Sequence, residues 1–528
     1  MTGPTTLPPT LEDACARWPQ RVAITDQRQA LTYETLRRRV GALAAAYTRL
    51  GVKPGDRVVC QLPTCPEFLV ALFAAWAWGA VHVGADKDLT GSELTWLVGH
   101  TDAAAVVFGP RPGAPEPWAP VHAVRQAHPG VHVIAHGAAL DGTADDSLER
   151  LLHAPERDSS LPGQAPFGAD DTAVLFMTSG TTGRPKGVIE TIPSLWAKMG
   201  FLAGMFCPGP EDVHLMYLPL SHAYGMKLAV LGLLTGGRVV MLDRFTPAET
   251  LRLITSEQAT VLPGTPAHFR LVLDNLDPAC HRVDSLRWAL ASAAPLPPAL
   301  ARDIYARLGA DVLYTYGCSE GFLTLTADRD EILRGSVGRR AFHGPEDTSP
   351  TGTLAILDPD NGSHLPTGEV GEIAFGASRP VRYWADPPVA TDGWYHTGDL
   401  GRVDTDGCLY VLGRLKDLVN RGGMNVAPGE VEAVLVRHPG VADGAVVATP
   451  DAVLGEAICA CVVPAAGDPP DLAELRDFLG ETLARHKLPD ELCLVEEIPR
   501  TKISKVDRGA LQDRVADKGP TRQRARAG

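Results

Sequence analysis

The chain has 528 residues, 45% hydrophobic and 21% charged, the composition of a globular protein too long for one ordinary domain. Its 49 basic and 63 acidic residues give a formal net charge of −14, which argues against sequence-independent nucleic-acid binding and against attraction to anionic membranes. The ten cysteines show no zinc-ligand spacing and no signal peptide is recognisable, so we expect reduced thiols in a cytoplasmic protein.

The longest apolar run, residues 68–84, is slightly short for a membrane span. Pro66 can begin a helix and Gly79 can end it. A strand at residues 80–83 then follows. We therefore expect a buried helix and strand here, not a membrane segment.

From about residue 20 to residue 410, strand patterns alternate with helical ones, which predicts an α/β fold with a large N-terminal domain of layered parallel or mixed sheets. The helical pattern of residues 33–50 is an example. Two stretches rich in proline and glycine, residues 110–120 and 153–170, predict surface links between subdomains. The clearest predicted strands are residues 57–61, 104–108, 132–135, 238–242 and 260–262.

After about residue 413 the pattern becomes compact and predicts a small α+β domain. A helix is expected at residues 428–437, strands near residues 444–448 and 457–463, and a longer helix from Asp471. The basic tail, residues 518–528, is expected to be disordered. The apolar face of the longer helix has leucines at spacings of three and four: Leu472, Leu475, Leu479 and Leu483.

The segment TSGTTGRPKG, residues 178–187, follows a short strand predicted at residues 172–177. Its glycines, including Gly180, let the backbone approach a ligand, and Lys186 offers a compact positive charge. A solvated turn is the alternative, and a Walker A loop is excluded because Gly187 and apolar residues follow the lysine. A polyphosphate loop is therefore predicted, with hydroxyl donors from Thr178, Ser179, Thr181 and Thr182.

Three later segments carry groups suited to a nucleotide. In YTYGCSE, Tyr316 can stack on a base and Glu320 can hold Mg²⁺ together with phosphate oxygens. In WYHTGDL, Asp399 can accept hydrogen bonds from both hydroxyls of a ribose, and Arg414 of GRLKD can donate from the opposite side. Each segment alone also fits a core tyrosine or a surface charge, as does the basic loop at residues 499–508.

Taken in order, these segments resemble the AMP-forming adenylating superfamily, and within it the acyl- and aryl-CoA ligases of the 4-coumarate–CoA ligase-like branch. TSGTTGRPKG resembles the family's phosphate loop, YGCSE and YHTGD two of its nucleotide segments, and GRLKD its hinge. The resemblance covers nearly the whole chain. It implies a reaction in two steps: a carboxylate attacks the α-phosphate of ATP to give acyl-AMP and pyrophosphate, and a thiol then displaces AMP.

The resemblance also implies an organisation into domains. Residues 1–412 would bind ATP and the acid, residues 413–416 would form a hinge about Lys416, and residues 417–516 would be a mobile lid domain. The tail from residue 517 to residue 528 would be disordered.

The family's nucleotide roles map onto matching positions. Lys505 would bridge the substrate carboxylate and the α-phosphate, Glu320 would bind Mg²⁺, and Lys186 with residues 178–182 would hold the β- and γ-phosphates. Ser504 stands where the family usually has glycine before the catalytic lysine. Asp399 and Arg414 would hold the ribose, and the remaining AMP-site positions are Ala293, Ala294, Pro295, Tyr314, Tyr316, Gly317 and Ser319.

The segment LPLSHAYG, residues 218–225, matches the family's acyl pocket. It lacks the aspartate that amino-acid-activating domains place there, so we do not expect an α-amino acid. The order His222-x-Tyr224 resembles aryl-CoA ligases and implies an aromatic or bulky apolar acid, with His222 also among the catalytic residues; a core histidine is the alternative. The expected pocket residues are His222, Tyr224, Ala294 and Gly317.

No Gly-Gly-x-Ser-Leu segment for phosphopantetheine attachment is present, so the thiol must come from outside. The main expectation is CoA, reached through a channel at Arg421, Gly422 and Gly423, although Asn420 stands where CoA ligases often carry lysine. The alternatives are a free-standing adenylation enzyme that loads the phosphopantetheine of a separate acyl or aryl carrier protein, and an inactive binding relative. The expected partners are a carboxylic acid, ATP and CoA, without nucleic acid or membrane.

Overall fold

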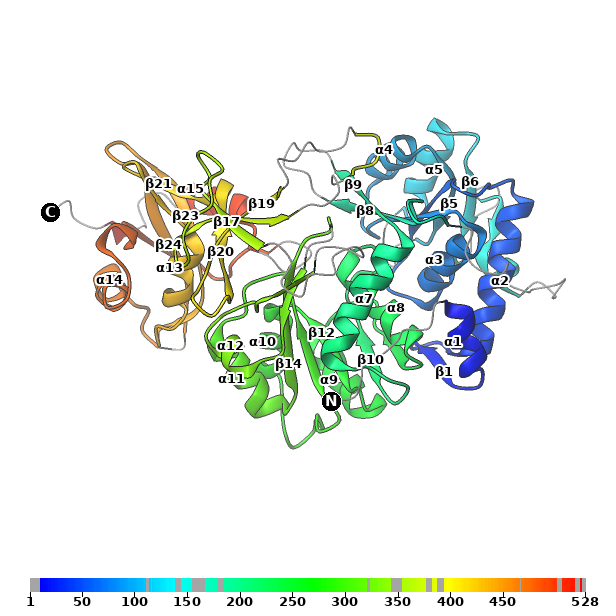
Figure 1. The fold of residues 1–528 in the computed structure, drawn as a ribbon, viewed down its shortest axis with the longest axis horizontal. Helices are drawn as coiled ribbons and strands as arrows, with labels where there is room; N and C mark the ends of the chain where they lie inside the picture. The colour runs from blue at the N-terminus through cyan, green and yellow to red at the C-terminus, as the bar shows by residue number, and fades with distance from the viewer. Residues whose placement is uncertain are drawn as a thin grey trace.

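The computed structural model describes most of the chain and contains four β-sheets with helices packed on them (Figure 1). The expected fold class, α/β with a large N-terminal part and a smaller C-terminal one, is confirmed. The described residues are 10–110, 114, 116–137, 144–153, 167–178, 185–320, 323–342, 354–376, 382–386, 394–465, 467–500, 506–517 and 523–524.

A seven-stranded sheet has the order β7-β6-β5-β3-β4-β8-β9 and is parallel except for β9, which pairs antiparallel with β8. Its strands are β3 (Arg57–Gln61), β4 (Val81–Gly84), β5 (Ala103–Phe108), β6 (His132–Ala135), β7 (Asp146–Ser147), β8 (Val174–Thr178) and β9 (Lys186–Glu190). Its connecting helices are α3 (Pro66–Trp78), α4 (Gly91–Thr101), α5 (Ala119–Ala127) and α6 (Leu148–Leu152).

The apolar run forms the predicted helix and strand. Helix α3 begins at Pro66 and ends before Gly79, which has a left-handed φ of 82°, a conformation that favours glycine. The prediction for the two proline-rich stretches is wrong in one respect. Residues 110–120 connect β5 to α5 and residues 153–170 connect α6 to β8, so both join elements of one sheet and do not link subdomains.

A nine-stranded sheet has the order β16-β15-β14-β13-β12-β10-β11-β1-β2 and a parallel centre. Its strands are β1 (Val22–Thr25), β2 (Ala30–Thr32), β10 (Val213–Met216), β11 (Arg238–Met241), β12 (Val261–Gly264), β13 (Trp288–Ala291), β14 (Asp311–Gly317), β15 (Leu323–Thr326) and β16 (Arg340–Phe342). The helices of this region are α1 (Leu11–Arg17), α2 (Tyr33–Arg49), α7 (Ile192–Phe206), α8 (Ala223–Leu234), α9 (Pro247–Glu257), α10 (Pro266–Asp274), α11 (Pro298–Asp303) with a π turn at Ile304–Leu308, and α12 (Arg329–Leu333).

One hydrophobic core joins the two large sheets through the helices between them. The indole rings of Trp76 on α3 and Trp196 on α7 meet edge to face, with centroids 5.9 Å apart. The buried hydroxyl of Tyr33 on α2 lies 2.8 Å from the carbonyl oxygen of Leu233, at the end of α8. Buried aromatic packing and satisfied polar groups therefore hold the helices between the two sheets together.

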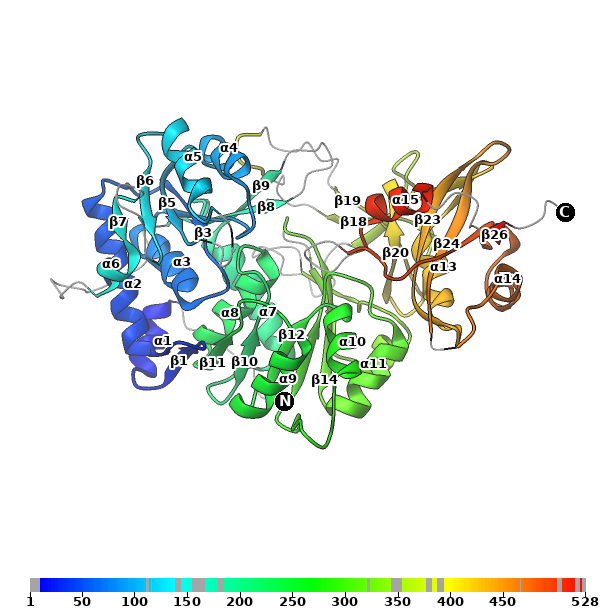
Figure 2. The same ribbon diagram turned by 180° about the vertical axis from the view of Figure 1, so that it is seen from behind.

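A four-stranded antiparallel sheet lies between the nine-stranded sheet and the C-terminal part of the molecule (Figures 1 and 2). The short 3₁₀ turn Leu415–Asp417 leads from its last strand to the C-terminal sheet. The four strands are β17 (Leu354–Leu357), β18 (Gly371–Gly376), β19 (Trp394–Val403) and β20 (Leu409–Arg414).

The C-terminal sheet has six strands and its own hydrophobic clusters. Its strands are β21 (Val419–Arg421), β22 (Met424–Val426), β23 (Val441–Asp451), β24 (Gly455–Pro464), β25 (Glu491–Leu494) and β26 (Gln523–Arg524). Its helical elements are α13 (Pro428–Leu435), α14 (Leu472–Gly480), the 3₁₀ turn Arg485–Lys487 and α15 (Arg508–Asp517).

Two expectations for this region need correction. Helix α14 ends at Gly480, so Leu483 lies beyond the helix, although it still packs against the same hydrophobic cluster. In the tail, Gln523–Arg524 pairs with β25, and the Gln523 side chain accepts a hydrogen bond from the backbone of Leu472 at 2.8 Å. This pairing orders two residues that the basic composition assigned to a disordered arm.

Among the helices of the described residues, none combines the length and the apolar character needed to cross a membrane. Helix α3 is strongly apolar, and its side chains from Pro66 to Trp76 are buried within the protein.

Candidate active site

The phosphate loop is anchored at both ends by the antiparallel pairing of β8 and β9. Thr178 and Lys186 are partners in this ladder, and the Thr178 hydroxyl donates to the Lys186 carbonyl oxygen at 3.3 Å. The intervening candidates Ser179, Gly180, Thr181 and Thr182 lie outside the described residues. The two ends of the predicted phosphate loop are therefore held on neighbouring strands.

A segment without any recognised motif, residues 382–386, lies along β9. Trp384 donates its backbone N–H to the Gly187 carbonyl oxygen at 2.7 Å, and Val188 and Tyr383 form an antiparallel bridge. The Lys186 ammonium lies 5.0 Å from the centroid of the Tyr383 ring, within the range of a cation–π interaction. Tyr383 therefore lies beside Lys186 at the edge strand β9, which we call the phosphate edge of the candidate site. The sequence motifs do not predict this residue.

Tyr383 also connects the phosphate edge to Glu320. Its hydroxyl donates to Glu320 Oε1 at 3.0 Å. Burial and the Glu320 carboxylate raise the pKa of the Tyr383 phenol well above its ordinary value, so it stays a neutral donor. Tyr383 thus contacts both Lys186, through its ring, and Glu320, through its hydroxyl. One carboxylate oxygen of Glu320 is already hydrogen-bonded to Tyr383.

A second group of predicted residues meets around Asp399. Asp399 and Arg414 face each other in the β19–β20 ladder, and Arg414 Nε lies 2.8 Å from Asp399 Oδ1. The Tyr316 hydroxyl, from β14, donates to Asp399 Oδ2 at 2.7 Å. Burial and this carboxylate raise the pKa of the Tyr316 phenol well above its ordinary value. Three strands from two sheets therefore contribute to one hydrogen-bonded group, Asp399, Arg414 and Tyr316, which we call the polar corner.

Glu372, on β18, shapes the turn that presents Asp399. Its two carboxylate oxygens lie 2.9 Å from the Gly398 backbone nitrogen, which donates, and 2.8 Å from His396 Nδ1. Gly398 has a left-handed φ of 69°, which glycine adopts without steric cost. Glu372 is buried and acts as a positioning residue. No local motif marks it, because it reaches the turn through cross-strand pairing.

The segment ASAAPL, residues 291–296, begins at the last residue of β13 and is held against β14. The Tyr314 hydroxyl accepts a hydrogen bond from the Leu296 backbone at 2.9 Å, and the Ser292 hydroxyl donates to the Thr315 carbonyl oxygen at 3.2 Å. Burial raises the pKa of Tyr314 to about 12. Tyr314 is thus a buried support of this segment, which presents Ala294 half-buried and Pro295 exposed.

Ala293 in this segment has a φ of 70°, in the left-handed region. That conformation costs a non-glycine residue roughly 1–2 kcal/mol, while glycine in its place would lose part of the gain through backbone entropy. We expect Ala293→Gly to raise the free energy of unfolding by about 0.5–1 kcal/mol in denaturant titrations. Ala294→Gly is the matched control and should bring no gain, because Ala294 has no positive φ; equal effects would contradict the backbone explanation.

His222 and Tyr224 begin helix α8 beside the end of β13. His222 is the N-cap residue of α8 and is half-buried. The Tyr224 hydroxyl donates to the Leu290 carbonyl oxygen at 2.7 Å, and burial raises the pKa of this phenol well above its ordinary value. The hydroxyl is therefore committed to the protein. Gly317 ends the neighbouring strand β14, and Ser319 is half-buried in the turn that follows it.

The remaining candidates lie in the C-terminal part of the chain. Lys416 is exposed in the 3₁₀ turn between β20 and β21. Arg421 donates to both carboxylate oxygens of Asp490, at 2.8 and 2.6 Å. Gly422 and Gly423 form the two-residue turn between β21 and β22, both with positive φ, as such tight hairpins require. Lys505 lies outside the described residues.

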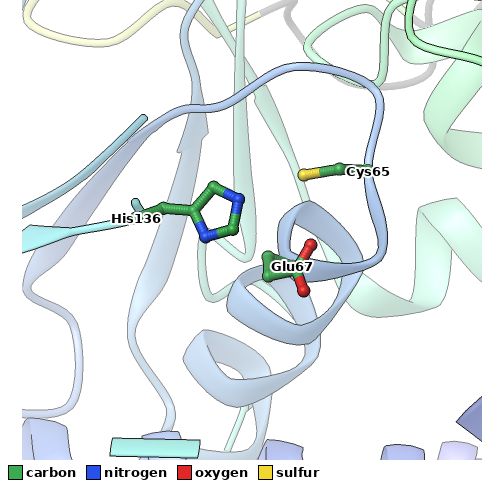
Figure 3. Close-up of side chains that lie close together, drawn as sticks. All are labelled: Cys65, Glu67 and His136. Atoms are coloured by element: carbon green, nitrogen blue, oxygen red, sulfur yellow. The ribbon is translucent and has the colours of Figure 1, made fainter. Parts of the chain in front are cut away.

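Three potential metal ligands that belong to none of these motifs meet at the start of α3: Cys65, Glu67 and His136 have ligand atoms within 4.8 Å of one another (Figure 3). Arg39 Nη1 lies 3.7 Å from Glu67, and His136 Nδ1 lies 2.9 Å from Glu149 Oε1. Burial raises the pKa of the Cys65 thiol well above its ordinary value. Because Arg39 already balances Glu67, we describe these groups as a polar cluster and base no function on them.

Comparison with known proteins places these observations in a family. The AMP-binding enzyme family matches residues 11–379, and the AMP-binding enzyme C-terminal domain matches residues 430–505. Triostin synthetase I of Streptomyces triostinicus is 34% identical over 514 residues, covering 95% of this chain and 93% of that protein. The 2-hydroxy-7-methoxy-5-methyl-1-naphthoate–CoA ligase of Streptomyces carzinostaticus is 34% identical over 523 residues, covering 95% of this chain and 92% of that protein.

Solved structures agree over the same extent. The amide bond synthetase McbA from Marinactinospora thermotolerans matches with a TM-score of 0.82 and 30% identity, covering 94% of this chain and 97% of that one. ATP-bound MatB from Rhodopseudomonas palustris matches with a TM-score of 0.78 and 27% identity, covering 94% of this chain and 96% of that one. The chain, with its phosphate loop, nucleotide segments and two-part fold, belongs to the AMP-binding enzyme family, within the AMP-forming adenylating superfamily.

Proposed function

We propose that the protein activates a carboxylic acid with ATP, forming acyl-AMP and pyrophosphate, and then transfers the acyl group to the thiol of CoA. The observation that carries this proposal is the polar corner of Asp399, Arg414 and Tyr316. It adjoins the phosphate edge, because Tyr316 and Glu320 belong to one short segment at the end of β14. A nucleotide bound across both would have its ribose at the corner and its phosphates at Lys186.

The phosphate edge suits a complex of Mg²⁺ with ATP. Lys186 and residues 178–182 would hold the β- and γ-phosphates, and Glu320 would bind the metal ion. Glu320 fits this role because, among the residues that the structure describes, Tyr383 is hydrogen-bonded to one of its oxygens, and Mg²⁺ prefers one or two carboxylates together with phosphate oxygens and water. A bound Mg²⁺ supplies charge neutralisation, while the chain's own groups position the α-phosphate for attack.

The adenosine would lie against β14 and the ASAAPL segment. Tyr316 would flank adenine, and Ser319, Gly317 and residues 293–295 would complete the AMP site. Tyr314 would support it indirectly, because its hydroxyl holds the backbone of Leu296.

Asp399 should contribute strongly to the use of ATP. Replacing Asp399 by Asn removes the negative charge that is paired with Arg414 and hydrogen-bonded to Tyr316. The replacement also removes a charged hydrogen-bond acceptor for the ribose hydroxyls. Hydrogen bonds to charged groups contribute about 1.5–3 kcal/mol, so we expect kcat/KM for ATP in pyrophosphate exchange to fall about ten- to hundredfold.

Asp404→Asn is the matched control for this prediction. Asp404 follows the same strand and its carboxylate also accepts a tyrosine hydroxyl, from Tyr410 at 2.9 Å. Its replacement should leave kcat/KM for ATP within about threefold, as expected for a change outside the site. Equal losses in both variants would mean that the four-stranded sheet had been disturbed, which would contradict a ribose contact.

The acid would bind beside the start of α8, in a pocket formed by His222, Tyr224, Ala294 and Gly317. Because the Tyr224 hydroxyl is committed to Leu290, the ring offers an apolar surface, which supports an aromatic or bulky apolar acid. The acid named for the Streptomyces carzinostaticus relative is also aromatic. We place His222 next to the reacting carboxylate.

The change from one sheet to the next supports the proposed domain organisation. Residues 1–412 would bind ATP and the acid, residues 413–416 would act as the hinge, and residues 417–516 would form the lid that carries Lys505. The 3₁₀ turn that contains Lys416 connects β20 of the four-stranded sheet to β21 of the C-terminal sheet. Arg421, Gly422 and Gly423 lie at the start of the lid and would line the path of the thiol.

CoA is the proposed acceptor because the relative from Streptomyces carzinostaticus is a CoA ligase. A separate carrier protein is the second candidate, since the chain lacks a phosphopantetheine attachment segment of its own. The structural neighbour named as an amide bond synthetase makes an amine the third acceptor to test.

The test is an ATP–pyrophosphate exchange assay with a panel of aryl and alkyl carboxylic acids, followed by addition of CoA, a holo carrier protein or an amine. We expect exchange with at least one aryl acid, and formation of the acyl-CoA thioester with release of AMP when CoA is added. Transfer only to the carrier protein or to the amine would replace CoA as the acceptor. Absence of exchange with every acid at high protein concentration would support an inactive binding relative.

A further inference from the structure

Three charged side chains meet in the protein interior between β9, α7 and α8. Lys198 Nζ donates to Glu190 Oε1 at 2.6 Å, and Lys227 Nζ donates to Glu190 Oε2 at 3.4 Å. The exposed fractions of the three side chains are 6% for Lys198, 2% for Glu190 and 11% for Lys227. We call this group the buried charge triad.

The buried charge triad is unbalanced, because two ammonium groups share one carboxylate. Burial alone would raise the pKa of Glu190, yet the ammonium groups of Lys198 and Lys227 lower it to about 2. The short contact makes Lys198 its principal partner, so the excess positive charge belongs to Lys227. Among the described residues, Glu190 is the only carboxylate paired with Lys227, and an uncompensated charge in the interior is costly to keep.

The position of Lys227 relates this excess charge to the acid pocket. Lys227 lies three residues after Tyr224 on α8, a spacing that places both on one side of the helix. Its ammonium lies 5.5 Å from the centroid of the Phe176 ring, on the strand that leads into the phosphate loop. It also interacts electrostatically with Cys318, which directly follows Gly317. Lys227 therefore lies on the helix that begins at the proposed acid pocket, and it interacts with the residue next to Gly317 of that pocket.

We propose that Lys227 binds a second acceptor group on the acid, an anionic oxygen, a hydroxyl oxygen or a ring nitrogen, in addition to the carboxylate that is activated. The inference rests on the proposed function and narrows its substrate class. A hydrogen-bond acceptor on the ligand would pair with the Lys227 ammonium, which shares the Glu190 carboxylate with Lys198. An acid without such a group would leave the charge unsatisfied, and sites built in this way discriminate strongly against the analogue that lacks the acceptor.

The experiment compares acids that differ by one acceptor group, using pyrophosphate exchange by the full-length protein. The pairs are benzoate with 2-hydroxybenzoate, benzoate with 2-pyridinecarboxylate, and 2-naphthoate with 3-hydroxy-2-naphthoate. The wild-type protein should prefer the acceptor-bearing acid of at least one pair. In Lys227→Met, which keeps an unbranched side chain one atom shorter and removes the charge, the ratio of kcat/KM values within that pair should fall about ten- to hundredfold, as expected for losing a charged hydrogen-bond partner.

Glu190→Gln is the matched control, because it disrupts the buried charge triad but keeps Lys227. This variant should retain or increase the preference for the acceptor-bearing acid, whatever its stability. A purely structural role of the triad would lower kcat/KM for both acids of a pair alike, in both variants.

A pH profile gives an independent readout. Burial lowers the pKa of Lys227 to about 8, so its charge is present below that pH and is lost above it. The groups that face it are Glu190, Lys198 and the Cys318 thiol. Because kcat/KM reports ionisations of the free enzyme, the wild-type preference should decline as the pH rises through about 8, and Lys227→Met should remove that dependence.

The same assay distinguishes failure of the proposed function from failure of the role proposed for Lys227. Exchange with none of these acids and with none of the wider panel of aryl and alkyl acids would contradict the proposed function itself. Exchange with both members of every pair, with a ratio that Lys227→Met leaves unchanged or without any wild-type preference, would overturn only the role of Lys227.

Discussion

Lys505→Ala is expected to slow acyl-AMP formation about 10²–10³-fold, the scale known for losing one preorganised donor to a developing charge. The resemblance to adenylating enzymes places the Lys505 ammonium between the substrate carboxylate and the α-phosphate, where negative charge accumulates as the bond forms. Thioester formation from supplied acyl-AMP should suffer much less, because that step no longer joins two anions. Single-turnover assays of each half-reaction measure the two effects separately.

Lys502→Ala is the control for this prediction, because it removes the same charge from the same basic segment. It should leave both half-reactions within about threefold of the wild type, since it retains the positioned cation. Equal loss of the two half-reactions in Lys505→Ala would show that Lys505 has another role.

Lys416→Pro is expected to separate the half-reactions in the opposite direction. Lys416 lies in a 3₁₀ turn, where φ is about −50 to −70°, so proline, with φ near −65°, fits the described backbone but prevents rotation about that bond. Adenylation should continue, while transfer from acyl-AMP to the thiol should fall by on the order of 10²-fold or more, because misplacement of reacting groups by about 1 Å has effects of this size.

The informative control is Lys416→Ala, which removes the side chain and leaves the backbone free to rotate. It should retain both steps. Full thioester turnover by Lys416→Pro would contradict a hinge at this residue, and loss of adenylation would show that proline had disturbed the fold of this turn.

Elements with strong local signals were predicted well. The helix at Pro66–Trp78 and its ending at Gly79 follow from an apolar run limited by a proline and a glycine. The length of α14 was overestimated, because leucine spacing continues to Leu483 although the helix ends at Gly480. The proline-rich stretches were assigned to domain links because composition indicates loops and cannot indicate which elements the loops join.

Of the candidate site, too, the sequence predicts some residues and misses others. Tyr316, Asp399 and Arg414 lie in separate motifs, and the structure brings their side chains within hydrogen-bond distance. Tyr383 and Glu372 lie in no motif, yet one lines the phosphate edge and the other shapes the turn at Gly398. Their positions depend on pairing with β9 and across the four-stranded sheet, which local sequence does not encode.

The sequence by itself determined the family and the type of chemistry, because the motifs of the family are short segments whose residue types and order are sufficient to recognise them. Only the tertiary structure decided which groups surround those segments. Lys227 shows the reason most clearly: as one lysine within an apolar helix it has no motif, and its excess charge becomes evident only when strand pairing and helix packing bring it to a carboxylate that Lys198 already neutralises. Charge balance in a protein interior is a property of neighbours in space, and those neighbours are distant in the chain.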